Sequence, residues 1–150
     1  MYEQLLVSVK DILNTSTESK AMQLEKICNL LKEEVAHYDW VGFYFHIPGE
    51  KMLELKAFAG LPTDHTKIPF GKGICGQVAV SNQDFIVPDV SLQDNYISCN
   101  INVKSEIVIP MFKAGTNIGQ IDIDSNTKNA FSEEDAHFLK AVNRLVAETL

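Results

Sequence analysis

The feature that most constrains this chain is the order of its two hydrophobic periodicities. Apolar residues recur every three or four positions near both ends, at residues 2–13, 18–37 and from 132 onward. Runs rich in aromatic and β-branched residues lie between them, at 39–47, 52–59, 85–87, 105–111 and 117–124. The first pattern predicts amphipathic helices and the second predicts strands. Helices at the ends of a block of strands predict an α+β domain, with a central antiparallel sheet and the helices gathered on one face.

Composition narrows the class of protein. The chain has 150 residues, which is enough for one domain with a buried core, and we expect a single domain over 1–150. The net charge is −7 and no cluster of Lys or Arg occurs, so binding to nucleic acid or to an anionic membrane is disfavoured. No signal peptide opens the chain, and no apolar run approaches the ~20 residues of a membrane span. We therefore expect a soluble, cytoplasmic protein.

Three cysteines carry most of the reactive chemistry of the sequence. An odd number in a chain of this kind argues against a disulfide framework. The four histidines show no metal-ligand spacing, and no CxxC or HExxH motif occurs, so no metal site is predicted. Cys28 falls on the apolar stripe of the helix expected over 18–37, which is typical of a small buried hydrophobe. Cysteine chemistry then depends on Cys75 and Cys99.

These two cysteines stand in different local contexts. Cys99 lies in a long segment without periodicity, 88–103, and such loops in compact domains are commonly functional or mobile. An exposed thiol among polar residues would be accessible to react. Cys75 follows a glycine-punctuated turn at 71–76, which we expect to lead into a short helix. At a helix start, the N-terminal dipole favours a thiolate.

Three carboxylates form a second candidate group. Asp122 and Asp124 lie on one face of the same expected strand, about 7 Å apart, and Asp is disfavoured in strand interiors. Facing a pocket, the two could hold an ammonium group or share a proton. Glu106, one strand earlier, could complete the cluster. The alternative is that these acids form an ordinary solvent-exposed edge.

Two aromatic residues form a third candidate group. On the strand expected over 39–47, Val41 and Phe43 lie on the predicted core face, and Trp40 and Tyr44 lie on the other. Gly42, between the two aromatics, leaves open space on that second face. Either another element covers this face, or Trp40 and Tyr44 form the aromatic wall of a pocket.

Six sequence blocks in a fixed order extend this interpretation. They are DWVGFY at 39–44, PFGKGICG at 69–76, VPDV at 87–90, SC at 98–99, KSEIV at 104–108 and GQIDIDS at 119–125. As a set they resemble the GAF-domain free methionine-(R)-sulfoxide reductases. The resemblance implies a single GAF domain, with a central antiparallel sheet flanked by N- and C-terminal helices. It also implies a homodimer formed through the terminal helices.

The resemblance further implies roles for the candidate residues. Cys99 corresponds to the catalytic thiol, and Trp40 and Tyr44 correspond to the aromatic pocket. The substrate-binding and proton-handling acids correspond to Glu106, Asp122 and Asp124. The implied reaction reduces free methionine-(R)-sulfoxide and leaves a sulfenic acid on the cysteine. A second thiol then condenses with it, and thioredoxin or another thiol reductant supplies the electrons, with no bound cofactor.

The sequence departs from the family pattern around Cys99, at residues 95–100, and more importantly at one other position. The family usually has its resolving cysteine ten residues before Cys75, where this chain has His65. Cys75 could take over resolution, or an external thiol could reduce the sulfenic acid directly. In a third interpretation, the protein keeps the pocket but does not catalyse the reaction, and acts as a GAF sensor of a small molecule or of redox state.

Overall fold

The computed structural model describes residues 1–15, 17–94, 96 and 101–150. Its helices are α1 (Tyr2–Leu13), α2 (Lys20–Glu34), α3 (Gly73–Ser81) and α4 (Glu133–Glu148), with a short 3-10 helix at Val90–Leu92. Its strands are β1 (Trp40–His46), β2 (Met52–Ala59), β3 (Lys67–Pro69), β4 (Phe85–Val87), β5 (Ser105–Lys113) and β6 (Thr116–Ser125). None of the helices in the described ranges is long and apolar enough to cross a membrane.

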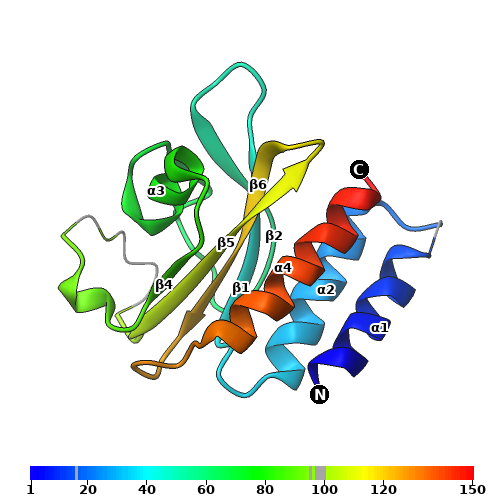
Figure 1. Ribbon diagram of the computed structural model, residues 1–150, viewed down its shortest axis with the longest axis horizontal. Helices are drawn as coiled ribbons and strands as arrows, with labels where there is room; N and C mark the ends of the chain where they lie inside the picture. Colours follow the sequence, from blue (N-terminus) through cyan, green and yellow to red (C-terminus); the bar gives the residue numbers. More distant parts are fainter. Residues whose placement is uncertain (16, 95, 97–100) are drawn as a thin grey trace.

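The strands form one antiparallel sheet in the order β3-β2-β1-β6-β5-β4. Helices α1, α2 and α4 lie together on one side of this sheet, and α3 lies on the other (Figure 1). The predicted α+β architecture, with the terminal helices gathered on one face, is confirmed. The sequence pattern did not predict strand β3, because its three residues are too few to show a periodicity.

The main core lies between the sheet and the three terminal helices. Val41 and Phe43 of β1 and Ile121 and Ile123 of β6 point into it and are fully buried. Cys28 of α2 is also fully buried in this core, as its position on the apolar stripe predicts.

The opposite face of the sheet is covered by α3 and the loops around it. Trp40, Tyr44 and Val108 on the strands pack here with Ile74 and Val78 of α3 in a second apolar cluster. Both faces of the central strands are therefore buried, so any polar group on the α3 side is removed from bulk water.

Asp135 ties the start of α4 to α1 and to the turn before β1. Its side chain accepts the backbone N–H of Ser132 at 3.0 Å, which completes a capping box with that residue. Its Oδ1 accepts the hydroxyls of Tyr2 and Tyr38 and lies 2.9 Å from Nε2 of His37. Burial alone would raise the pKa of Asp135, but these hydrogen bonds outweigh it and lower the pKa.

We expect Asp135→Ala to lower the free energy of unfolding by about 3 kcal/mol at pH 7, because it removes the acceptor of the buried Tyr38 hydroxyl and of the partly buried Tyr2 hydroxyl. Since folding lowers the pKa of this carboxyl, its contribution is complete above the ordinary carboxyl range. It disappears as the pH falls through the folded-state pKa. Urea unfolding at neutral and acidic pH measures both effects, with the exposed neighbour Glu134→Ala as the control. Equal unfolding midpoints for the two variants would contradict this role.

Candidate active site

Three carboxyl groups meet on adjacent strands on the α3 side of the sheet. Glu106 of β5 pairs with Asp124 of β6, and Asp122 lies two residues away on the same face. The exposed fractions are 5% for Glu106 and 2% for each aspartate. The solvent-exposed alternative for these acids is therefore excluded.

Helix α3 brings Cys75 onto this acid cluster, defined here as Glu106, Asp122 and Asp124. The thiol of Cys75 donates to Oδ2 of Asp122 at 3.3 Å and lies 4.0 Å from Oε2 of Glu106. The next residue, Gly76, permits the close approach of the helix, because a Cβ there would lie 2.7 Å from the carbonyl oxygen of Pro69. The glycine-rich turn thus serves to pack α3 against its own preceding loop.

The environment of Cys75 disfavours the thiolate. Burial is the main cause of a pKa well above the ordinary thiol value, and the negative charges of Asp122 and Glu106 raise it further. The sequence-based expectation that the helix dipole would favour a thiolate at Cys75 is wrong. Desolvation and like charges outweigh the partial charge of one helix terminus.

The two aspartates are also pushed toward their protonated forms. Burial raises the pKa of Asp122, and hydrogen bonds from Glu106 and Cys75 oppose the shift. Burial raises the pKa of Asp124 further, with the nearby charge of Asp122 adding to it. Oδ1 of each aspartate is buried without a hydrogen-bond partner among the described residues. The cluster is suited to holding a proton or accepting a cationic group.

The two aromatic residues lie beside the acids. The indole of Trp40 covers Gly42, where a Cβ would come within 2.3 Å of the ring, and its Nε1 donates to the carbonyl of Leu61 at 2.9 Å. The expectation that Gly42 leaves open space is wrong, because this ring fills it. The hydroxyl of Tyr44 donates to the carbonyl of His65 at 3.0 Å.

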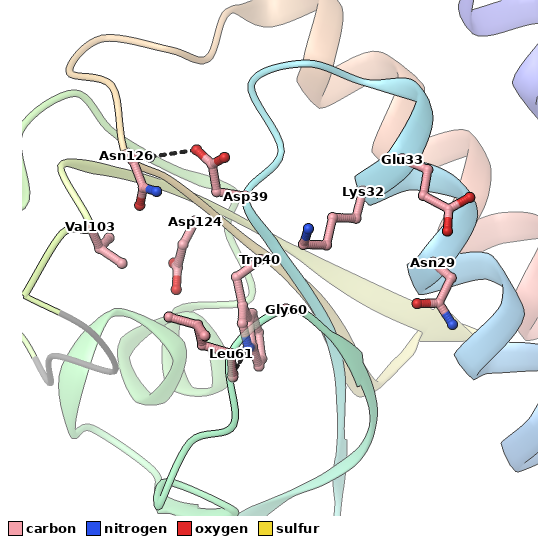
Figure 2. A pocket seen from close by; sticks show the side chains of 10 residues that line it. All are labelled: Asn29, Lys32, Glu33, Asp39, Trp40, Gly60, Leu61, Val103, Asp124 and Asn126. Atoms are coloured by element: carbon pink, nitrogen blue, oxygen red, sulfur yellow. Dashed lines mark hydrogen bonds between the residues drawn. The ribbon is translucent and has the colours of Figure 1, made fainter.

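Two cavities adjoin the acid cluster. The larger measures about 470 Å³ and is lined by residues that include Lys32, Asp39, Trp40, Leu61 and Asp124 (Figure 2). The smaller measures about 20 Å³ and is lined by residues that include Tyr44, His65, Cys75, Glu106 and Asp122. The acids therefore separate a roomy cavity from one that holds about one water molecule.

One donor set in the described part of the chain could hold a metal ion. A sulfur of Cys75 and carboxylate oxygens of Glu106 and Asp122 lie within 4.8 Å of one another, and no histidine belongs to the set. The prediction that the site works without a metal stays a prediction.

The structure brings together six of the seven candidate residues: Trp40, Tyr44, Cys75, Glu106, Asp122 and Asp124. Cys99 lies outside the described residues, so its distance from Cys75 stays open. Val103, four residues after it, lines the larger cavity. Sequence reasoning missed Lys32, since nothing in the pattern of a surface helix marks one lysine as lining a cavity on the strands.

Comparison with known proteins shows which family the chain belongs to. The GAF domain family model matches residues 21–150. The free methionine-R-sulfoxide reductase of Saccharomyces cerevisiae is 33% identical, with 96% of this chain and 82% of that protein covered.

Two solved structures are similar as well. The type II free methionine-R-sulfoxide reductase of Thermoplasma acidophilum is 40% identical, with a TM-score of 0.82 over 87% of this chain and 91% of that chain. The free methionine-R-sulfoxide reductase of Neisseria meningitidis, solved in complex with its substrate, is 32% identical. Its TM-score is 0.91 over 99% of this chain and 87% of that chain.

Proposed function

The chain belongs to the GAF-domain free methionine-(R)-sulfoxide reductase family, and we propose that it reduces free methionine-(R)-sulfoxide to methionine. One observation carries the proposal: Glu106, Asp122 and Asp124 are buried together beside a cavity walled by Trp40. A buried group of acids suits a substrate that brings an ammonium group and needs a proton at its sulfoxide oxygen. The similarity to reductases over nearly the whole chain supports the same reaction class.

In the proposed mechanism, the thiolate of Cys99 attacks the sulfoxide sulfur. A protonated carboxyl of the acid cluster gives its proton to the sulfoxide oxygen as the sulfur–oxygen bond breaks. The oxygen passes to the cysteine sulfur as the new bond between the two sulfur atoms breaks, which leaves methionine and a cysteine sulfenic acid. The methionine sulfur thereby gains two electrons and the cysteine sulfur loses two. The remaining acids hold the ammonium group of the substrate.

Resolution of the sulfenic acid is assigned to Cys75. Its sulfur attacks the sulfur of Cys99, a disulfide forms and the oxygen leaves as water. Asp122, 3.3 Å from the thiol of Cys75, is placed to take the proton of that thiol. His65, which stands where the family usually has its resolving cysteine, lines the same small cavity as Cys75. Reduction of the sulfenic acid by an external thiol is the alternative.

Three further features complete the proposal. Thioredoxin or another thiol reductant reduces the disulfide, so no bound cofactor is needed. The chain works in the cytoplasm, where such reductants keep thiols reduced. It forms a homodimer through its terminal helices, which light scattering of the purified protein measures directly.

Steady-state turnover tests the function. The purified protein, with dithiothreitol as reductant, should convert free methionine-(R)-sulfoxide to methionine and leave the (S) epimer unchanged. Absence of turnover in a folded protein would contradict the proposal and favour the non-catalytic sensor interpretation.

The reductant separates the two resolution pathways. We expect Cys75→Ser to lose at least about tenfold in turnover with thioredoxin and its reductase, because no disulfide forms for thioredoxin to reduce. Turnover with dithiothreitol should stay within about threefold of the wild type, since a small thiol can reach the sulfenic acid directly. Equal losses with both reductants, or none with either, would remove Cys75 from the resolving role.

A further inference from the structure

A lysine in the larger cavity is not used by the proposed mechanism. Lys32 of α2 is the one basic side chain among the described residues that line this cavity. Its ammonium group forms no hydrogen bond or ion pair within the described ranges. The side chain extends from α2 toward Trp40 (Figure 2). A cation without a partner therefore lines the larger cavity, which is the open side of the site.

A carboxylate oxygen without a partner faces the same cavity. Asp124 lines it, is only 2% exposed, and has its Oδ1 without a hydrogen-bond partner among the described residues. Asp39, the nearby alternative, already accepts the backbone N–H of Asn126 at 2.7 Å. Figure 2 shows Asp124 and Lys32 on the two sides of Trp40. Glu33 lines the cavity as well, but on the exposed surface of α2. The cavity thus offers a buried carboxylate oxygen without a partner and a cation, which together are the complement of a zwitterion.

The two cavities differ in what they can hold. The larger, about 470 Å³, lies within the range of small-molecule sites, which runs from about 300 to 1,000 Å³. The smaller, about 20 Å³, has room for about one water molecule. The head group of an amino acid therefore fits only on the Lys32 side of the acid cluster.

The charge of the substrate explains why a cation is needed there. A free amino acid carries a carboxylate as well as an ammonium group, and it must approach three buried acids in a protein of net charge −7. Those of the acids that are ionised attract the ammonium group and repel the carboxylate. Without a cation on the open side, the site would not favour the free amino acid over a form that lacks the carboxylate.

We propose that Lys32 binds the α-carboxylate of free methionine sulfoxide while Asp124 accepts its ammonium group. This inference rests on the proposed function and names the residue that selects the free amino acid. Methionine sulfoxide within a peptide has lost that carboxylate charge, so Lys32 gives it no charge-assisted hydrogen bond. Lys72, which lines the small cavity, is the rival cation.

Binding of two ligands to four proteins tests the proposal. Isothermal titration calorimetry, in the Cys99→Ser background so that no turnover occurs, would compare methionine-(R)-sulfoxide with its carboxamide. The carboxamide keeps the ammonium group and loses the carboxylate charge. The proteins are the parent and its Lys32→Met, Lys32→Arg and Lys72→Met derivatives. Lys32 is exposed on a helix, so its replacement should leave the fold intact.

We expect Lys32→Met to raise the Kd of methionine-(R)-sulfoxide about tenfold, the loss of one charge-assisted hydrogen bond. It should leave the Kd of the carboxamide unchanged. Lys32→Arg should stay within about threefold of the parent, and Lys72→Met should match the parent for both ligands. In the protein that retains Cys99, Lys32→Met should raise the KM for methionine-(R)-sulfoxide and leave kcat within about twofold of the wild type.

Three results would overturn the assignment. They are an unchanged Kd in Lys32→Met, an equal loss for both ligands, and a carboxylate-specific loss in Lys72→Met instead. Each of these leaves the proposed function standing as long as the wild-type protein turns over. Absence of binding by the parent together with absence of turnover by the wild type would remove the proposed function itself, and this inference with it.

Discussion

Cys99→Ser should abolish the reduction of free methionine-(R)-sulfoxide, with kcat falling by at least about a thousandfold, as when other enzymes lose their nucleophile. A serine hydroxyl ionises far less readily than a thiol, and serine has no sulfur atom that could form a sulfenic acid. The loss should be the same with dithiothreitol and with thioredoxin, since the first chemical step precedes the choice of reductant. Methionine production over time, at saturating substrate, measures it.

The other cysteines provide the controls for this result. Cys28→Ala should keep full turnover, because Cys28 is buried in the core on the helix side of the sheet, away from the acids. Cys75→Ser should keep turnover with dithiothreitol. Substantial turnover by Cys99→Ser would assign the nucleophile to another residue, and Cys75 would be the one to test next, because it touches the acid cluster.

Asp122→Asn should lower kcat/KM by about a hundredfold to ten-thousandfold, the range expected when a positioned acid or base is removed. Asp122 accepts the thiol of Cys75 and shares a face of β6 with Asp124, and an amide of the same shape can neither give up a proton nor take one at neutral pH. Kinetics over a range of substrate concentrations measures the loss.

The fold should tolerate this substitution. Since folding raises the pKa of Asp122, an ionised carboxyl here costs stability at every pH above its ordinary value. Asparagine removes that cost, so the free energy of unfolding at pH 7 should be unchanged or higher.

Asp135→Asn is the matched control for Asp122→Asn, because Asp135 is an equally buried acid on the helix side of the sheet. It should lower stability and leave kcat/KM close to the wild-type value. Wild-type kinetics in Asp122→Asn would remove Asp122 from the site, whatever its effect on folding.

Periodicity predicted the architecture well because the two faces of the sheet bury different kinds of residue. Ile121 and Ile123 alternate with Asp122 and Asp124 along β6. The two-residue period of a strand therefore places the isoleucines in the core and the acids on the opposite face. The same alternation could not show whether the face that carries the acids is exposed to solvent or buried. This face is buried because α3 packs over the strands, and that packing depends on contacts between residues distant in sequence.

The parts of the site that sequence did not predict depend on tertiary context. The helix start at Cys75 indicated a low thiol pKa, but burial beside Asp122 and Glu106 reverses the direction. Gly42 indicated open space, but the ring of Trp40 folds back over it. Lys32 lies in the last turn of α2, a helix on the other side of the sheet, and no sequence pattern relates that turn to the cavity beside Trp40.

The central claim is that Cys99 takes the oxygen of free methionine-(R)-sulfoxide, and a single-turnover experiment tests it most directly. The reduced Cys75→Ser protein would be mixed with substrate in the absence of reductant, and the sulfenic acid trapped with dimedone before mass spectrometry. We expect about one methionine per chain and a dimedone adduct on Cys99. Methionine formed with Cys99 unmodified, or no methionine from a folded protein, would contradict the claim.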